Sequence, residues 1–562
     1  MINRSLLFLP ILLLFHFCQA QSYPQNYFRH PLSIPMQLVA NFGEIRTNHW
    51  HMGLDIRTQQ RVNLPVYAAA EGYISRISVE PGGFGQAIYI NHPNGYTTVY
   101  GHLNSFFPAL ADYVKQKQYE KESWNLNLIL SPNLFPVKKG DFIALSGSTG
   151  GSEGPHVHFE IRDTKTENCL NPLLFKFPIA DAVAPSVMRL AMYDRNKSTW
   201  EQSPQLLSLR KAGSIYTIPA SSVRVGTDKI SFAVGAVDRL SGTNNPNGIY
   251  SAEISMDGKL ISSFTLDNIS YDDTRYINAQ LDYPFKSRVG SSLQHISPLS
   301  GALEVGYELF DKTGIIQLND KEPHQILIIL KDANGNSSKI QFNVQYDESL
   351  SKTYPSTNGE RFLPNHVNVF EREHFELFTT ERSIYDTIAV SYTETNNNAV
   401  NAVSPLYSFF SKAIPSHDSI TVRIKPGENI PEEWKDRVVI KNICGERTFV
   451  EKAQWQSGWY AAKFRQFGTY QAFIDKEPPV INTPPGNLSK ATRIVFIPRD
   501  NFNSIKSFRA EVDGNWLRFS NDKGKTWIYS FDEHFTRGEH ELKVVVEDEA
   551  GNVTTRVWNV TR

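Results

Sequence analysis

The spacing of apolar and polar residues between positions 21 and 180 is typical of a β-rich domain. Short runs that favour β-strands alternate there with turns that contain Gly, Pro and Asn. The segment His92-Pro93-Asn94-Gly95 predicts a hairpin turn between two of these runs. We expect strands at 65–70, 72–79, 87–91, 97–100, 141–146 and 156–161.

One stretch of this segment, Pro108–Trp124, has a different pattern. Its apolar residues Leu110, Tyr113 and Val114 lie among Lys, Gln and Glu, as on a helix with one buried face. We therefore predict a helix here, inside an otherwise β-rich domain.

Beyond residue 180, runs rich in Val, Ile and Phe alternate with Asn, Asp and Gly turns, and a repeat is visible. His324–Val344 aligns without gaps on His540–Val560. Each segment contains an apolar strand, a D-x-x-G-N turn and a second strand, and similar linkers precede the two units at 181–185 and 475–479. This pattern predicts a pair of immunoglobulin-like β-sandwiches, the first of them enlarged by insertions.

The N-terminus is typical of a secretory signal. Arg4 precedes an apolar run, Leu6–Phe17, and small residues end at Ala20, so we expect cleavage after Ala20 and a secreted or periplasmic protein. A membrane anchor is disfavoured because spanning needs about 20 apolar residues, and no later stretch is apolar enough. A lipoprotein would use Cys18, but Phe17 directly before it fits poorly.

These patterns predict a predominantly all-β chain, with an antiparallel β domain that carries a helical insertion, followed by β-sandwich modules. The expected organisation is a signal peptide at 1–20, the antiparallel domain at 21–180, an immunoglobulin-like sandwich at 181–346, a β-rich domain of unassigned fold at 347–474 and a second immunoglobulin-like sandwich at 475–562.

Charge and composition exclude some classes of function. With 57 Lys and Arg against 58 Asp and Glu, the net charge of −1 argues against a nucleic-acid partner, and 34 Phe, 24 Tyr and 9 Trp supply several packed cores. The 3 Cys exclude a disulfide scaffold. In the mature chain we expect Cys169 and Cys444 to be free, buried thiols.

Histidines gather in the first domain. His156 and His158 alternate with Val157 in a strand-like run, so their side chains share one face, about 6.6 Å apart at Cα. His51 and Asp55 flank Gly53, and an imidazole with a carboxylate is an ordinary zinc ligand set. Six of the 15 His lie between residues 49 and 158: His49, His51, His92, His102, His156 and His158.

Three ordered motifs resemble the lysostaphin/LytM-type zinc endopeptidases of bacterial cell walls. They are H-x-G-x-D from His51, Y-G-H-L from Tyr100 and G-S-T-G-G-S-E-G-P-H-V-H-F-E from Gly147, within a resemblance that covers about residues 35–165. The 37 residues between His102 and Gly140 depart from the compact family pattern and look like an insertion, to which we assign a role in substrate access.

The resemblance implies one Zn²⁺ held by His51, Asp55 and His158, with His102 and His156 as catalytic residues beside it. Three protein ligands leave a position open for water, as in catalytic zinc sites. His156 is the candidate general base, and His102 would assist proton transfer or stabilise the oxyanion. The Gly-rich loop Gly147–Gly154 is expected to form a wall of the substrate groove.

The expected function is a zinc metallo-endopeptidase that hydrolyses peptide cross-links of peptidoglycan. Its partners are the peptide stems of the wall and, through the β modules, envelope proteins. The alternative is a catalytically silent envelope protein that activates other wall hydrolases; the intact ligand set favours the enzyme. An endopeptidase acting on proteins is a weaker option.

Other conspicuous residues have plainer interpretations. We expect His49 to line the groove or point away from it, and His92 to belong to the hairpin turn. Ser520–Trp527 matches the Asp-box pattern of sialidase-type propellers, where it recurs in each blade. Here it occurs once, so we expect a hairpin in the last sandwich rather than a glycosidase.

Overall fold

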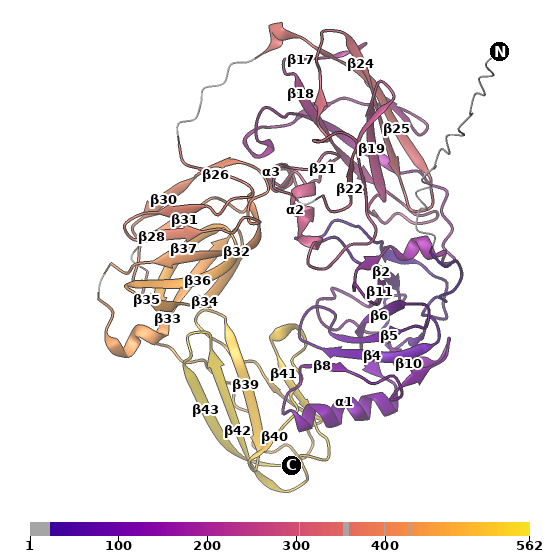
Figure 1. Cartoon of the computed structure of the whole chain (residues 1–562). Helices are drawn as coiled ribbons and strands as arrows, with labels where there is room; N and C mark the ends of the chain where they lie inside the picture. The colour runs from indigo at the N-terminus through magenta and orange to yellow at the C-terminus, as the bar shows by residue number, and fades with distance from the viewer. Residues whose placement is uncertain (1–22, 303, 352–358, 398, 428) are drawn as a thin grey trace, which may run out of the picture.

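A computed structural model describes residues 23–302, 304–351, 359–397, 399–427 and 429–562 of the chain. The expected signal peptide therefore lies outside the described residues. Within them, the sheets fall into four groups along the chain, which we call region one (23–180), region two (181–351), region three (359–474) and region four (475–562). The groups follow one another around a closed loop in Figure 1.

Region one is built on a large antiparallel sheet in the order β1-β2-β11-β6-β5-β4-β8. Its strands are β1 (Leu38–Ala40), β2 (Leu54–Arg57), β11 (His156–Asp163), β6 (Tyr96–Leu103), β5 (Gln86–Asn91), β4 (Gly72–Val79) and β8 (Leu126–Ile129), extended by β9 (Pro136–Val137) and β12 (Cys169–Leu170). A smaller sheet joins β3 (Pro65–Tyr67), β10 (Phe142–Leu145) and β7 (Ser105–Phe106). The predicted strands are present, although β3 ends at Tyr67.

The predicted helix is α1 (Pro108–Glu120), four residues shorter than expected. Pro108 begins it, where a missing N–H costs nothing, and Leu110 and Val114 bury one face in the region-one core. The helix ends because Glu122 takes a left-handed backbone with φ 45°. The rest of the insertion adds β8 and β9 to the edge of the sheet at β4.

Region two contains a pair of larger sheets. One runs β14 (Gln205–Leu207), β13 (Ser186–Asp194), β18 (Lys229–Val237) and β21 (Gln294–His295), with β23 (Ile316–Gln317) on β18. The other runs β15 (Arg210–Ala212), β16 (Ile215–Thr217), β25 (Ser337–Tyr346), β24 (Pro323–Lys331), β19 (Ser251–Met256), β20 (Lys259–Thr265) and β22 (Tyr307–Leu309), with β17 (Val223–Val225) on β25. Short helices α2 (Ile277–Gln280) and α3 (Tyr283–Val289) lie between β20 and β21.

Region three pairs β26 (Arg361–Phe362) with β29 (Ile388–Ala389) and adds larger sheets. These are β27 (Val369–Glu371), β28 (Phe375–Phe378), β32 (Pro415–Ile424), β36 (Trp459–Gln466) and β35 (Gln454–Gln456), and then β30 (Tyr392–Thr395), β31 (Leu406–Phe409), β37 (Gly468–Ile474), β33 (Val438–Cys444) and β34 (Arg447–Lys452).

Region four pairs β38 (Arg493–Phe496) with β41 (Trp527–Ser530) beside the sheet β40 (Asn515–Trp516), β39 (Ile505–Val512), β42 (Glu539–Asp548) and β43 (Val553–Thr561). The predicted repeat is present as matching hairpins, β24–β25 and β42–β43. His324 lies opposite Val344 in one and His540 opposite Val560 in the other. Each hairpin turn has a glycine at φ 92°. Glycine adopts this backbone conformation at little energetic cost, whereas residues with a side chain rarely adopt it. The immunoglobulin-like assignment of both regions stays a prediction.

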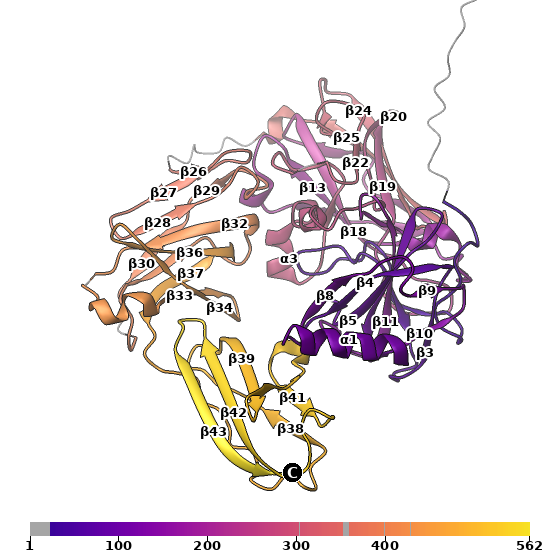
Figure 2. The same cartoon turned by 60° about the horizontal axis from the view of Figure 1, so that its bottom comes forward.

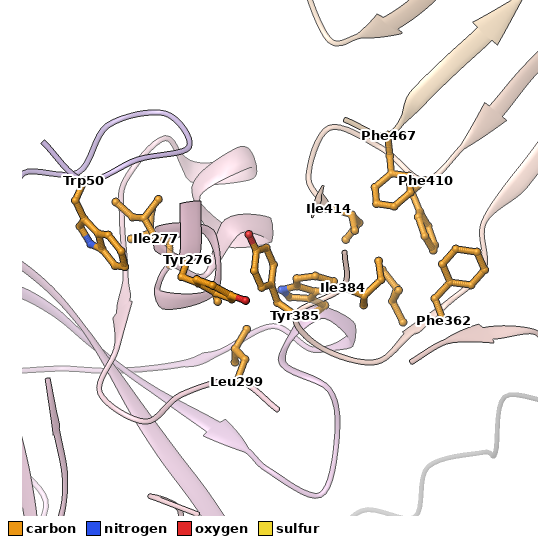
Figure 3. Packing of buried hydrophobic residues seen from close by; sticks show 14 of the residues in the cluster. Trp50, Tyr276, Ile277, Leu299, Phe362, Ile384, Tyr385, Phe410, Ile414 and Phe467 are labelled. Carbon is orange, nitrogen blue, oxygen red and sulfur yellow. The ribbon is translucent and has the colours of Figure 1, made fainter. Parts of the chain in front are cut away.

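One apolar cluster joins three of the regions. It runs from Trp50 of region one through Tyr276 and Leu299 of region two to Tyr385 and Phe410 of region three, as Figure 3 shows. Region four instead buries its own apolar cluster, drawn from residues 481–560. Regions one to three are therefore fixed to one another by shared burial of apolar side chains.

Region four returns to region one, so that β41 lies beside α1 in both Figure 1 and Figure 2. The contact is polar and aromatic. Tyr119 stacks on His534 with 3.6 Å between ring centroids and donates a hydrogen bond to Asp532 at 2.7 Å, and Lys115 pairs with Glu533 at 2.7 Å. The insertion that carries α1 thus forms a contact between regions.

The cysteine prediction is confirmed in part. Cys169 and Cys444 are both free, and Cys169 is buried. The expectation that Cys444 is buried is wrong, because it ends β33 at a hairpin and is half-buried. Among the described residues, every helix is too short or too polar to cross a bilayer.

Candidate metal and catalytic site

Neighbouring strands of the large sheet bring the predicted site residues together. His158 on β11 lies opposite Asp55 on β2, and on its other side opposite Gly101 on β6, one residue before His102. His51 comes from the turn that precedes β2. Gly101 leaves room for Phe84 and His158, because an added Cβ would lie 3.1 Å from Phe84 Cδ1 and 3.4 Å from His158 Cβ.

Three donor atoms meet at one point. The distances are 3.0 Å from His51 Nε2 to Asp55 Oδ1, 3.0 Å from His158 Nδ1 to Asp55 Oδ1 and 3.1 Å from His51 Nε2 to His158 Nδ1. All three residues are buried. Burial acts to raise the pKa of Asp55, but the surrounding His51, His156 and His158 hold it well below its usual range.

In His51 and His158, the ring nitrogen that faces away from Asp55 (the outer nitrogen) already has a hydrogen-bond partner. His51 Nδ1 lies 2.7 Å from the carbonyl oxygen of Asn41, and His158 Nε2 lies 2.9 Å from Glu160 Oε1. Both partners can only accept, so each outer nitrogen carries a proton, and the inner nitrogen is the one that can offer a lone pair to a metal. Two lone pairs and a carboxylate oxygen facing one point fit a divalent metal, with ligand bonds of about 2.0–2.2 Å for zinc.

The other two predicted histidines lie beside this point. His156 Nε2 is 3.3 Å from Asp55 Oδ1, while its Nδ1 donates to the carbonyl of Gly154 at 2.8 Å. His102 Nδ1 donates to the carbonyl of Thr149 at 2.8 Å, and its ring centroid is 4.7 Å from that of His156. Burial, with His158 and His156 nearby, lowers the pKa of His102 to about 3, so its ring is neutral. His102 takes a left-handed backbone with φ 60°, which aims the ring at the site.

Comparison with known proteins agrees with this geometry. Residues 49–119, which include His51, Asp55 and His102, match the model of peptidase family M23. Residues 49–119 thus resemble an M23 peptidase, and we call region one the M23 domain after this match. Further along the chain, residues 360–475 match a Zu5-like domain, which covers the part whose fold the sequence pattern did not identify.

Several curated proteins resemble the M23 domain. A protein of Haemophilus influenzae called an uncharacterized metalloprotease is 31% identical over 169 residues, 28% of this chain and 29% of its own. DD-carboxypeptidase/endopeptidase Mpg of Neisseria meningitidis is 31% identical over 141 residues, 25% of this chain and 24% of its own. Peptidoglycan DD-endopeptidase ShyB of Vibrio cholerae is 32% identical over 111 residues, 20% of each chain. The chain thus spans less than a third of these relatives.

The buried carboxylate of Glu160, which was not predicted from the sequence, holds His158 on the side that faces away from Asp55. Glu160, fully buried, binds His158 and also accepts bonds from Arg162 at 2.6 Å and from Tyr271 of region two at 2.5 Å. Burial acts to raise the pKa of Glu160, but Arg162 and His158 hold it at about 2. The sequence could have indicated Glu160, because it lies two residues after His158 and so on the same face of the strand. No pattern in the sequence indicated Tyr271.

Region four reaches the Gly-rich loop of the M23 domain. The N–H of Gly150 donates to Asp522 at 2.7 Å, the N–H of Lys523 donates to the carbonyl of Pro81 at 2.8 Å, and Lys523 Nζ donates to the carbonyl of Ser152 at 2.5 Å. These residues belong to the Asp-box segment, which forms the expected turn, with Ser520 bridged to Ile528. The turn therefore lies on the loop predicted to form a wall of the groove.

Two other histidines of the M23 domain, His92 and His49, lie outside the site. His92 is buried in its hairpin turn, where Nδ1 bonds the carbonyl of Glu71 and Nε2 bonds Thr98. His49 is exposed and bonds the carbonyl of Thr47. Both have structural partners of their own.

Proposed function

We propose that this protein is a zinc-dependent endopeptidase that hydrolyses peptide cross-links of bacterial peptidoglycan. The observation that carries the proposal is the meeting of His51, Asp55 and His158 at one point with His102 and His156 beside it. The names of two relatives, a DD-carboxypeptidase/endopeptidase and a peptidoglycan DD-endopeptidase, support this substrate class.

The donor set suits one zinc ion, held by His51, Asp55 and His158. Two imidazole nitrogens and one carboxylate oxygen make up a familiar catalytic zinc set, with a position left for water or substrate. Bound there, zinc supplies Lewis acidity, which activates water and polarises a carbonyl group.

The two other histidines would handle protons. Because His156 donates through Nδ1 to Gly154, its Nε2 is free to accept a proton beside Asp55, which fits a general base. His102 is held in the same tautomer by Thr149, so it too offers a proton acceptor rather than a donor. This favours proton transfer over oxyanion stabilisation as the role of His102.

The compartment follows from the substrate. Peptidoglycan lies outside the inner membrane, so we propose a secreted or periplasmic protein, as the N-terminal sequence predicts. Regions two to four would position the M23 domain on the envelope and on envelope proteins.

The test is digestion of purified cross-linked peptidoglycan, with product masses measured. Wild type should release the peptide products of cross-link hydrolysis, while His158→Ala and Asp55→Ala should lose at least about 10³-fold in rate. The matched control is His49→Ala, which removes an exposed histidine near the site but outside it. Metal analysis of the same samples should show zinc in the wild type and the control.

The opposite outcome is equally clear. Equal release by wild type and His158→Ala would eliminate the metal mechanism. No release by wild type, together with stimulation of a second purified wall hydrolase, would establish the silent activator instead.

A further inference from the structure

Regions two and four each contain a cluster of carboxylates that the M23 site does not use. Among the described residues, oxygens of Asp181, Asp238 and Asp332 lie within 4.8 Å of one another. The same is true of a second group in region four: Asp475, Asp500 and Asp548. Like charges this close repel, so each cluster needs a compensating partner.

The members of the first cluster have counterparts in the second. Asp332 and Asp548 are equivalent, because each begins the D-x-x-G-N turn of its repeated hairpin. Asp181 and Asp475 occupy the same place in the linkers. Five residues after Asp181, Ser186 pairs with Val237, which directly precedes Asp238.

The same spacing and strand pairing place the aspartates of region four. Five residues after Asp475, Val480 bridges to Arg499, which directly precedes Asp500. All three carboxylates are therefore placed by the repeated topology in both regions. Chance acidic residues would not follow the repeat in this way.

The hydrogen bonds around the clusters repeat as well. In region two, Asn336 donates from its side chain to Asp332 at 2.7 Å and to the carbonyl of Asp181 at 3.4 Å. In region four, Asn552 donates to Asp548 at 2.9 Å and to the carbonyl of Asp475 at 3.3 Å. These bonds fix the carboxylates but supply no positive charge.

One carboxylate oxygen in each cluster has no partner. Asp238 is only 2% exposed, yet its Oδ1 accepts no hydrogen bond from any described residue. Asp500 is half-buried, and its Oδ1 is a buried atom that accepts no hydrogen bond from a described residue. Burial, with Asp332 and Asp181 nearby, raises the pKa of Asp238 to about 7, and Arg239 offsets this only in part. A buried carboxyl group with an unpartnered oxygen that faces two other carboxyl groups indicates a missing cation.

We propose that each cluster is a Ca²⁺ site. The donors are carboxylates, and neither cluster contains a His or Cys ligand, which favours a hard cation over zinc. Calcium accepts irregular oxygen ligand sets completed by water, whereas magnesium requires near-octahedral geometry. Extracellular calcium modules bind with Kd of about 10⁻⁴–10⁻³ M, and we expect this range here.

The position of the clusters suggests what calcium does. Asp181 and Asp475 lie in the linkers that lead into regions two and four, and the N–H of Asp475 also donates to the carbonyl of Arg437 in region three at 2.9 Å. A cation that joins the linker aspartate to two aspartates of the following region would stiffen both junctions. Calcium would thereby set how region four is held against the M23 domain.

The test counts bound calcium. Full-length wild type, Asp238→Asn, Asp500→Asn and the double variant are freed of metal, resupplied with Zn²⁺ and equilibrated with radioactive Ca²⁺. Wild type should bind about one Ca²⁺ per cluster, each single variant should lose one and the double variant both. The matched control is Asp112→Asn, an exposed aspartate on α1, which should bind like wild type.

Thermal unfolding gives a second, independent measurement. Calcium at a hundredfold excess over Kd should raise the Tm of the wild type by about 5 °C or more and leave the double variant unchanged. Without calcium, Asp238→Asn should be at least as stable as wild type, because one of the repelling charges is gone; this shows that the variant folds. No calcium uptake by wild type at about 5 mM, or equal uptake by the double variant, would overturn the proposal. An equal Tm rise with Mg²⁺ would overturn the choice of calcium.

Discussion

Region two and region four both contact the M23 domain, but the interactions that hold each of them there are different. Region two shares an apolar core with it through Trp50, and its Tyr271 donates to Glu160, which bonds His158, the proposed metal ligand. Region four keeps its own core and meets the domain through hydrogen bonds, ion pairs and one aromatic stack at the Gly-rich loop and α1.

The difference indicates which contact is permanent. Apolar surface buried between regions stabilises them at roughly 25 cal/mol per Å², and separating them would expose it to water. Surface ion pairs contribute only about 0–1 kcal/mol each, and hydrogen bonds about 0.5–1.5 kcal/mol each. Region two is therefore expected to stay fixed to the M23 domain, whereas region four is held there by weaker individual contacts.

The largest effect is expected where the apolar core is broken. Trp50 is 1% exposed and donates from Nε1 to Gln280 of region two at 3.0 Å. Trp50→Ala should lower the free energy of unfolding by about 3–5 kcal/mol. Calorimetry of the full chain measures this, with Trp455→Ala, which removes a 46% exposed tryptophan of region three, as the matched control. A loss no larger than in the control would mean that the shared core does not hold the regions together.

Acid should weaken region two by a smaller amount. His295 is buried with both ring nitrogens unpartnered among the described residues, and burial lowers its pKa to about 3. The unfolded chain binds this proton below pH 6.5 while the folded chain does not, so stability is lost as the pH falls from 6.5 towards 3. At pH 5 the loss from this group is about 2 kcal/mol. Tm measured from pH 7 to 5 should fall less in His295→Phe than in wild type, and parallel curves would contradict the assignment.

Loss of the hydrogen bond to Glu160 should change zinc affinity at the proposed site about tenfold. Tyr271→Phe removes the hydroxyl that donates to Glu160, so His158 is held less firmly, and zinc affinity should drop by about tenfold. Competition with a chelator measures it. Tyr23→Phe is the matched control, because Tyr23 donates to Asp267 of region two at 2.7 Å away from the metal site. Equal zinc affinity in both variants would show that region two only packs against the M23 domain.

The smallest effect is expected at region four. Lys523→Ala removes the bond from Nζ to the Ser152 carbonyl on the Gly-rich loop, and the freed loop should accept an extended substrate more readily. We expect kcat/KM on cross-linked peptidoglycan to rise by about 2–10-fold. Lys525→Ala changes an exposed lysine two positions away and is the matched control. A lower kcat/KM would mean that the Asp-box turn helps to bind substrate.

The sequence predicted what local patterns encode. Alternation placed His156 and His158 on one strand face, and the spacing of His51 and Asp55 around Gly53 was enough to propose a shared site. The repeat correctly matched His324–Val344 with His540–Val560. The early end of α1 was missed because it depends on the left-handed backbone of Glu122, which its residue type does not favour.

The contacts between regions could not be predicted from the sequence. Tyr271 lies 111 residues from Glu160, and Asp522 lies 372 residues from Gly150. Such pairs follow from how whole regions pack, which no periodicity reports. For the same reason the insertion was assigned to substrate access, although its helix contacts Asp532 and His534.

The closed course of the chain has a consequence for how strong the region-four contact needs to be. Because regions two and three tether the Asp-box turn beside its loop, its effective concentration there is high, and a few weak bonds suffice to keep it seated. Such a latch opens whenever a competing ligand offers slightly better bonds, and the tether brings it back afterwards.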